Sequence, residues 1–251
     1  MKLTDNTIFI TGGGTGIGRG LAEALHKLGN KVIISGRRKE HLDGTTKANP
    51  GMDSVELDIA NPVNIAAVAK KLIADYSALN VLINNAGIML IDDAAGKIDD
   101  QLLTSTVTTN LLGPIRLTSA LIEHLKKQPN ATVIYNTSAL AFVPLALTAV
   151  YSSTKAALHS YVLSQRCKLK ASSVSVLEIS PPWVQPDLLN SKEEPRALPL
   201  KDFIEETMKL LAADANEIVV KQAKPFRNNP GPSEHALVTQ FNDTMAGNPS
   251  R

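Results

Sequence analysis

The chain has 251 residues, of which 43% are hydrophobic and 20% charged, so one α/β domain with a substantial core accounts for its length. Its formal net charge of +2, without a dense basic stripe, argues against a nucleic-acid-binding protein. The longest apolar stretch, 139–150, is too short to span a bilayer, and the polar segment 1–6 does not resemble a signal peptide, so we expect a cytoplasmic protein that acts on a small molecule.

Strand-like and helix-like segments alternate along the chain. Runs of β-branched and apolar residues predict strands over 7–11, 31–35, 54–57, 81–84, 132–137, 174–180 and 217–221. Helical spacing of apolar residues predicts helices over 16–28, 38–48, 62–76, 100–127, 152–170 and 200–213. The alternation predicts a single-domain Rossmann-type α/β fold over 1–251, a doubly wound parallel sheet with helices on both faces. The last part, about 225–251, is rich in Pro, Asn, Gly and Ser and is predicted to be an irregular C-terminal tail.

A glycine-rich turn joins the first predicted strand to the first predicted helix. Its residues include Gly12, Gly14, Thr15, Gly16, Ile17 and Gly18. The glycines let the backbone approach a pyrophosphate closely, and the helix N-terminus offers free N–H groups and a partial positive charge. A flexible turn without a ligand is the alternative, but the strand before it and the helix after it favour a dinucleotide site.

Ligands of doubly wound sheets bind beyond the carboxyl ends of the strands. Arg37 and Arg38 follow the second predicted strand in this chain. An acidic residue at this place usually accepts hydrogen bonds from the ribose hydroxyls of NAD, whereas an arginine suits the 2′-phosphate of NADP. The sequence therefore favours NADP over NAD, although the two arginines could also be solvated charges at the start of a helix.

Tyr151, Lys155 and Ser138 form a set that can move a proton to or from an oxygen on carbon. Tyr151 and Lys155 lie four residues apart at the start of a predicted helix and therefore share one face of it. A nearby ammonium favours the phenolate and is expected to lower the pKa of the phenol, which is ordinarily near 10. Ser138, at a strand end, can donate a hydrogen bond to a substrate oxygen. Taken singly, Lys155 could be a surface charge and Ser138 a turn residue.

Taken in this order, the motifs resemble those of the short-chain dehydrogenase/reductase family. The segment Thr11-Gly12-x-x-x-Gly16-Ile17-Gly18 is similar to the cofactor loop of that family, and Asn84-Asn85-Ala86-Gly87 is similar to its central-strand motif. The resemblance covers about residues 5–190. It implies a catalytic tetrad of Asn110, Ser138, Tyr151 and Lys155. Asn110 would disturb its helix and hold a water that connects the lysine to solvent; a hydrogen-bonded polar residue without a proton role is the alternative.

The same resemblance implies which residues hold an NAD(P)(H) cofactor. Asp58 would meet the adenine, although an aspartate at a strand end can equally cap the next helix. Thr15 is neutral where many NADP-preferring relatives have a basic residue, so NAD stays open. The predicted cofactor-binding residues are Gly12, Gly14, Thr15, Gly16, Ile17, Gly18, Arg37, Arg38, Asp58, Ile59, Asn85, Ala86, Gly87, Tyr151, Lys155, Pro181 and Val184.

The chain departs from the family pattern after the sixth predicted strand. Pro182 and Pro186 stand where the family commonly has a glycine and a threonine, and a proline offers neither a hydroxyl nor an N–H to the nicotinamide carboxamide. By family position, the substrate pocket is predicted to contain apolar residues and no cation, which suits a hydrophobic ketone. The residues predicted for it are Ala94, Leu140, Leu145, Trp183 and Leu188.

These features predict an NAD(P)-dependent carbonyl reductase that interconverts apolar ketones and secondary alcohols, resembling a bacterial ketone reductase. Two alternatives on the same fold stay open: a non-catalytic dinucleotide-binding sensor and an epimerase- or dehydratase-type relative that retains its cofactor. The histidines show no ligand spacing, so no metal site is predicted. The resemblance also implies a homo-oligomer, a tetramer, in which subunits pair through the helices at about 100–127 and 152–170.

Overall fold

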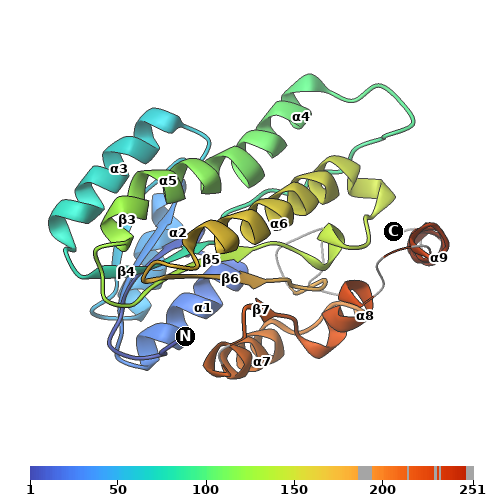
Figure 1. The fold of residues 1–251 in the computed structure, drawn as a ribbon. Helices are drawn as coiled ribbons and strands as arrows, with labels where there is room; N and C mark the ends of the chain where they lie inside the picture. Colours follow the sequence, from blue (N-terminus) through green and yellow to red (C-terminus); the bar gives the residue numbers. More distant parts are fainter. Residues whose placement is uncertain (186–193, 214, 229–230, 232, 247–251) are drawn as a thin grey trace.

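The computed structural model describes residues 1–185, 194–213, 215–228, 231 and 233–246, and its centre is one parallel sheet. The strands follow the order β3-β2-β1-β4-β5-β6-β7, and the order reverses between β1 and β4. The sheet lies in one layer between helices (Figure 1). Their bounds are β1 Thr7–Thr11, β2 Lys31–Gly36, β3 Asp53–Glu56, β4 Leu79–Asn84, β5 Ala131–Asn136, β6 Val174–Ile179 and β7 Glu217–Ile218. Such a reversal opens a crevice at the carboxyl ends of the two strands, where doubly wound folds bind their ligands.

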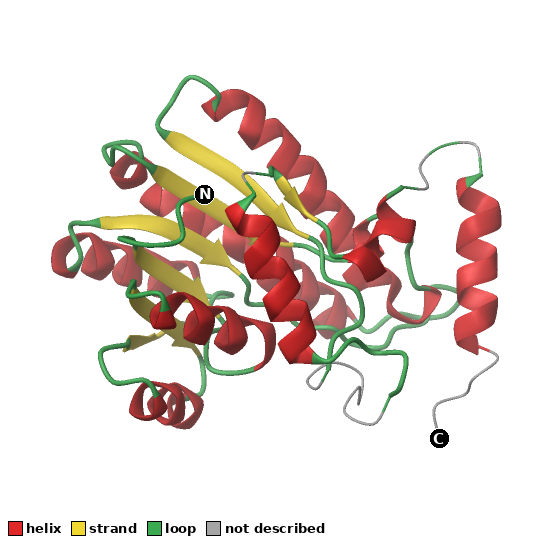
Figure 2. Ribbon diagram, turned by 90° about the horizontal axis from the view of Figure 1, so that it is seen from below, coloured by secondary structure: helices red, strands yellow, loops and turns green. Residues whose placement is uncertain are grey.

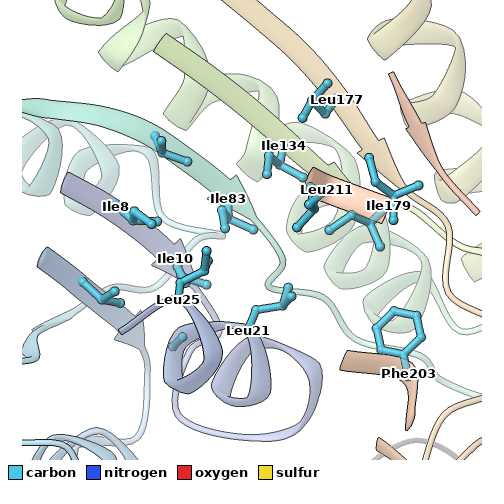
Figure 3. Packing of buried hydrophobic residues seen from close by; sticks show 14 of the residues in the cluster. Ile8, Ile10, Leu21, Leu25, Ile83, Ile134, Leu177, Ile179, Phe203 and Leu211 are labelled. Carbon is cyan, nitrogen blue, oxygen red and sulfur yellow. The ribbon is translucent and has the colours of Figure 1, made fainter. Parts of the chain in front are cut away.

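Helices cover both faces of the sheet, which confirms the predicted Rossmann-type fold. The helices described are α1 Gly16–Lys27, α2 Lys39–Ala48, α3 Pro62–Asp75, α4 Asp100–Val107, α5 Gly113–Leu125, α6 Ala149–Leu169, α7 Leu200–Ala212, α8 Lys224–Arg227 and α9 Glu234–Ala246. Strand β1 sends Ile8 and Ile10 toward α1 and α7, and Phe9 toward α3, α5 and α6. Figure 3 shows the first of these layers, where Leu21 and Phe203 pack beside the strands. Because both faces are covered, the central strands β1, β2, β4 and β5 are largely buried runs, whereas burial alternates along the edge strand β3.

The helix predicted over 100–127 is divided in the structure. Between α4 and α5, the segment Thr108–Leu112 forms a π-helical turn, in which the N–H of Gly113 donates to the carbonyl of Thr108. Pro114 follows directly and has no N–H to donate to the carbonyl of Asn110, four residues earlier. The irregular turn therefore places Asn110 at a local break in the helix, and such breaks are frequent at functional sites.

The prediction of an irregular tail over about 225–251 is wrong for its central part. Residues 234–246 form α9, which lies beyond the carboxyl edge of the sheet, near the start of α6 (Figure 2). Long-range contacts stabilise it: the ring of Phe241 packs edge-on against Phe226, with centroids 5.2 Å apart. Asn242 accepts a hydrogen bond from the N–H of Ala146 and donates one to the carbonyl of Pro144. The composition of the tail did not reveal this helix because its stability depends on distant residues.

Candidate active site

The carboxyl ends of the strands open into a cleft of about 940 Å³. Every residue that the sequence predicts for a dinucleotide cofactor lines it, from the glycine turn after β1 to Val184 after β6. The cleft also contains residues that the sequence did not predict. Those from α2 and from the C-terminal part of the chain are His41, Leu42, Arg196, Gln222, Phe226, Phe241, Thr244 and Met245.

The glycine turn fits the pyrophosphate of a dinucleotide. Gly12 has a positive φ of 66°, and a Cβ on Gly18 would come within 2.2 Å of the Gly12 carbonyl oxygen, so side chains are excluded where the turn meets α1. Thr15, the N-cap residue of α1, makes no side-chain cap hydrogen bond, and the first turn of α1 has no acidic residue. The N–H groups and the positive end of this helix therefore face the cleft, as an anion requires.

Hydrogen bonds tie the ends of three strands together at the floor of the cleft. The hydroxyl of Thr11 accepts from the N–H groups of Asn85 and Ala86, at 2.9 and 3.0 Å. The amide of Asn85 donates back to the carbonyl of Thr11, and Asn136 donates to the Asn85 side chain at 2.8 Å. The segments that follow β1, β4 and β5 are thus held as one rigid surface.

The wall that follows β2 carries positive charge and no carboxylate. It consists of Ser35, Gly36, Arg37, Arg38, His41 and Leu42, and both arginines are exposed. Asp58 lies at the end of the neighbouring strand, where its carboxylate accepts from the N–H of Ala60. The alternative role of Asp58 as the cap of α3 is wrong, because Asn61 caps that helix by accepting from Val63 and Asn64. Helix α3 begins at Pro62, as the sequence predicts, so Asp58 lies before its cap and remains in the cleft wall.

The structure brings Ser138, Tyr151 and Lys155 together at one end of the cleft. Tyr151 and Lys155 are 7% and 4% exposed, and the lysine Nζ lies 5.5 Å from the centroid of the phenol ring. The Ser138 hydroxyl accepts from the N–H of Leu140 and lies close enough to the Tyr151 phenol to lower its pKa. Lys155 donates to the carbonyl of Asn136 at 2.8 Å. A hydroxyl, a phenol and an ammonium therefore share a small space that is largely closed to water.

Burial is the largest influence on the pKa values of Tyr151 and Lys155. It raises the pKa of Tyr151 to about 12, against the hydrogen bond from Ser138, which lowers it. Burial also lowers the pKa of Lys155 to about 8, against the carboxylate of Glu178, which raises it. The pKa of Tyr151 is therefore raised in this structure and not lowered as expected, because desolvation of the phenol outweighs the effect of the neighbouring ammonium.

Asn110 is buried in the π-helical turn and is fully hydrogen-bonded through its side chain. Its oxygen accepts from the N–H of Ile88, and its amide donates to the Ile88 carbonyl and the Thr154 hydroxyl. These contacts join the segment after β4 to the helix of Tyr151. The backbone carbonyl of Asn110 has no α-helical donor, because Pro114 stands at the place of that donor.

The substrate side of the cleft is mainly apolar and contains the predicted Leu140, Leu145 and Trp183. Ala94, also predicted there, is instead exposed and lies outside the cleft wall, because the turn that begins at Asp93 directs it away. Leu188 and Pro186 lie outside the described residues. The apolar wall is completed by Met89, Leu90, Phe226, Phe241 and Met245.

The expectation that the pocket contains no cation is wrong, because Arg196 lines it. Its guanidinium donates to both oxygens of Glu194, at 2.8 and 2.9 Å, and lies 5.4 Å from the ring centroid of Trp183. The carboxylate neutralises the cation, so this part of the pocket carries no net charge. Backbone hydrogen bonds between Leu198 and both Trp183 and Gln185 hold the segment after β6 in place.

Within the described ranges, no three or more His, Cys, Asp or Glu side chains form a group that could hold a metal ion. Among the helices that the structure describes, none combines the length and the apolar character that a membrane crossing requires.

Comparisons with known proteins agree with this geometry. A family model described as short chain dehydrogenase matches residues 6–197. An uncharacterized oxidoreductase of Bacillus subtilis (strain 168), DltE, is 40% identical over 199 residues, which are 79% of each chain. An uncharacterized oxidoreductase of Staphylococcus aureus (strain USA300) is 31% identical over 188 residues, 72% of this chain and 79% of that one.

Solved structures share the fold over nearly the whole chain. A short chain dehydrogenase from Burkholderia cenocepacia J2315, in complex with NADP, superimposes with a TM-score of 0.83 at 26% identity and covers 96% of this chain and 98% of its own. An alcohol dehydrogenase from the archaeon Thermococcus sibiricus, complexed with 5-hydroxy-NADP, has the same fold, with a TM-score of 0.77 at 22% identity over 84% of this chain and 94% of its own.

Proposed function

The chain belongs to the short-chain dehydrogenase family of oxidoreductases, and from this premise we propose that it is an NAD(P)-dependent carbonyl reductase that interconverts apolar ketones and secondary alcohols. One observation carries the proposal. Tyr151 and Lys155 lie together in the cleft wall, with Ser138 close enough to the phenol to lower its pKa, at the point where an apolar wall meets a turn suited to a dinucleotide. Proton transfer to a carbonyl oxygen and hydride transfer to its carbon require this juxtaposition.

The cleft residues divide into groups that would hold different parts of the cofactor. The glycine turn and the N-terminus of α1 would hold the pyrophosphate, and Asp58 with Ile59 the adenine. Asn85 to Gly87, Lys155 and the segment from Pro181 to Val184 would hold the nicotinamide half. When bound, a nicotinamide dinucleotide supplies hydride for reduction and accepts it in oxidation.

Proton transfer to the substrate depends on Ser138, Tyr151 and Lys155. The Ser138 hydroxyl donates a hydrogen bond to the carbonyl oxygen of the ketone, and the Tyr151 phenol delivers its proton to that oxygen as negative charge develops there. At neutral pH Lys155 is an ammonium, because the pKa of about 8 lies above that pH, and its charge stabilises the phenolate that remains. The carbonyl of Asn110, which lacks its α-helical donor because of Pro114, would accept a hydrogen bond from a water that returns the proton from solvent.

Arg37 and Arg38 are expected to determine the choice of cofactor. The Burkholderia relative was solved with NADP, and here two exposed arginines and no carboxylate line the cleft wall after β2. Neutralising both in an Arg37→Ala, Arg38→Ala variant should raise KM for NADPH much more than KM for NADH, because arginine contacts with a phosphate are strong.

Steady-state kinetics with each cofactor provide the measurement for this variant. Lys39→Ala is the matched control, since Lys39 is an adjacent exposed cation that pairs with Asp43 and does not line the cleft. An equal rise in KM for both cofactors in the double-arginine variant would show that the arginines do not bind a 2′-phosphate.

The apolar wall predicts the class of substrate. Leu140, Leu145, Trp183 and Phe241 present hydrocarbon surface to the cleft, and Arg196 is neutralised by Glu194. Aliphatic and aryl ketones should therefore give larger kcat/KM values than keto acids of similar size. A panel of such substrates, followed by NADPH absorbance, tests this; a preference for the carboxylates would mean that Arg196 leaves Glu194 to bind them.

We also propose a homo-oligomer that pairs through α4, α5 and α6. Leu103 on α4 and Leu163 on α6 are each 40% exposed, and their place on the helices of the predicted interface supports this pairing. Light scattering at micromolar concentration should give a mass several times that of one chain. A mass equal to that of one chain would contradict this assembly.

A further inference from the structure

Strand β6 carries a carboxylate into the core. Glu178 is fully buried between Leu177 and Ile179, and it faces the same side of the sheet as its partner in the register, Tyr135. A buried carboxylate is tolerated only when hydrogen bonds and positive charge satisfy it. The proposed reaction involves none of its atoms, so the position of Glu178 needs another explanation.

Two side chains from other elements satisfy this carboxylate. The hydroxyl of Thr137, at the end of β5, donates to Oε1 at 2.6 Å. Nδ1 of His159, on α6, lies 2.8 Å from Oε2 and 3.0 Å from Oε1. The imidazole in turn packs edge-on against Phe142, with ring centroids 5.0 Å apart. Glu178 thus joins β5, β6 and α6 through one buried polar contact.

Thr137 and His159 are each a neighbour of a group in the proposed reaction. Thr137 immediately precedes Ser138 in the chain. His159 follows Lys155 by one helical turn, so both side chains lie on the same face of α6. The contacts of Glu178 therefore fix the strand end that carries Ser138 relative to the helix that carries Lys155.

The charge of Glu178 also acts on Lys155. The carboxylate favours the ammonium form of Lys155 and opposes the effect of burial, which lowers the pKa of the lysine. Other charged groups near the pair are Arg166 on α6, Arg227 on α8 and Glu217 on β7. Arg227 pairs with Glu217 at 2.8 Å, and Arg166 donates to backbone carbonyls. Glu217 is satisfied by Arg227, which leaves Glu178 as the carboxylate that acts on Lys155.

We propose that the Glu178–His159 pair positions the active site: it anchors the strand end of Ser138 to α6 and holds a carboxylate against the turn of α6 that follows Lys155. The inference rests on the proposed carbonyl reductase function, because it concerns the proton donor of that reaction. With this charge present, Lys155 keeps its ammonium form to higher pH beside Tyr151, the other titratable group next to it. Without the charge, the ammonium is lost at lower pH.

The variant Glu178→Gln tests the charge, because it keeps the side-chain length and an acceptor for Thr137. The alkaline limb of its pH profile of kcat/KM for ketone reduction should move to lower pH by roughly one unit. Glu217→Gln is the matched control, since it neutralises a carboxylate of the same surroundings that does not act on Lys155, and its profile should coincide with the wild type. A Glu178→Gln profile that also coincides with the wild type would overturn the proposal.

The variant His159→Gln tests whether the pair holds the strand end of Ser138 against α6. It also tests the proposal if Glu178→Gln does not fold. The His159 side chain is 16% exposed, so its replacement disturbs the core less. Because Ser138 loses its fixed position, kcat should fall about tenfold, while the Kd of NADPH changes less than about twofold. Quenching of the fluorescence of Trp183, the single tryptophan, by NADPH reports that Kd. An unchanged kcat in folded His159→Gln would contradict the anchoring role.

A binding measurement separates this proposal from the proposed function. If the wild type reduces no ketone, the proposed function fails, but the pH dependence of NADPH affinity still reports on Lys155. As the pH is raised, the NADPH affinity of Glu178→Gln should then begin to fall at a lower pH than that of the wild type. The reason is that the lysine of the variant loses its proton at a lower pH. Identical pH dependence of the two affinities would overturn the role of Glu178.

Discussion

Replacement of Tyr151 by phenylalanine should reduce ketone turnover at least about 100-fold, the usual scale for a positioned acid–base group. The substitution removes only the hydroxyl, so the ring keeps its place in the buried start of α6, where the side chain is 7% exposed. Melting temperature and NADPH affinity should stay close to those of the wild type. Stopped-flow or steady-state assays at saturating cofactor give the comparison.

The matched control is Tyr76→Phe, which removes a phenol hydroxyl outside the cleft that donates to Asp53. Its turnover should equal that of the wild type even if its stability falls.

In alcohol oxidation, the phenolate of Tyr151 must accept the proton. Because burial raises the pKa of Tyr151 to about 12, the phenolate is scarce at neutral pH, and the wild-type rate should rise with pH. Retention of most ketone reduction by Tyr151→Phe would refute the proposed proton donor.

The second large effect is expected for Lys155→Met, which should lose at least about 100-fold in kcat/KM and also bind the cofactor more weakly. Lys155 supplies the positive charge beside the phenol and, in the proposed role, a contact with the nicotinamide ribose. Methionine fills similar space without a charge. Turnover and the quenching of Trp183 fluorescence by NADPH measure the two losses separately.

An exposed lysine of the same helix provides the control for this variant. Lys168→Met should leave both quantities unchanged, because Lys168 lies near the far end of α6 and outside the cleft. If Lys155→Met keeps the cofactor affinity of the wild type and loses only turnover, the ribose contact is wrong and the electrostatic role remains. If it keeps both, neither role holds.

Local sequence patterns were sufficient to predict most of the fold. The apolar runs of β1 and β5 indicate strands that are buried on both faces, and the Leu21–Leu25 spacing of α1 indicates a helix with one buried face. Each of these patterns lies within one segment of the sequence. The glycine turn could be predicted for the same reason, since its steric requirement lies between residues six apart, Gly12 and Gly18. Element ends differ from the predictions by a few residues, as in β7, which ends at Ile218.

The features that the sequence did not reveal depend on distant partners. Helix α9 is held by Phe226 and by Asn242 contacts with a loop nearly one hundred residues earlier, at Ala146. A glutamate in a strand is usually expected to face solvent, so the sequence gives no sign that Glu178 is buried. Only the register of β6 with β5 and the packing of α6 show that it is buried and paired with His159. The high pKa of Tyr151 likewise follows from burial, which the four-residue spacing to Lys155 does not contain.

The central claim is that the chain reduces ketones with a nicotinamide cofactor and the proton of Tyr151. The most direct test incubates the wild type with NADPH and an aryl ketone, follows near-ultraviolet absorbance, and measures the alcohol that forms. We expect one alcohol for each NADPH consumed, with consumption abolished in Tyr151→Phe. A wild type that binds NADPH and consumes none with any ketone would contradict the account: it would indicate a dinucleotide sensor, or, if substrate changes without net cofactor turnover, an epimerase- or dehydratase-type enzyme.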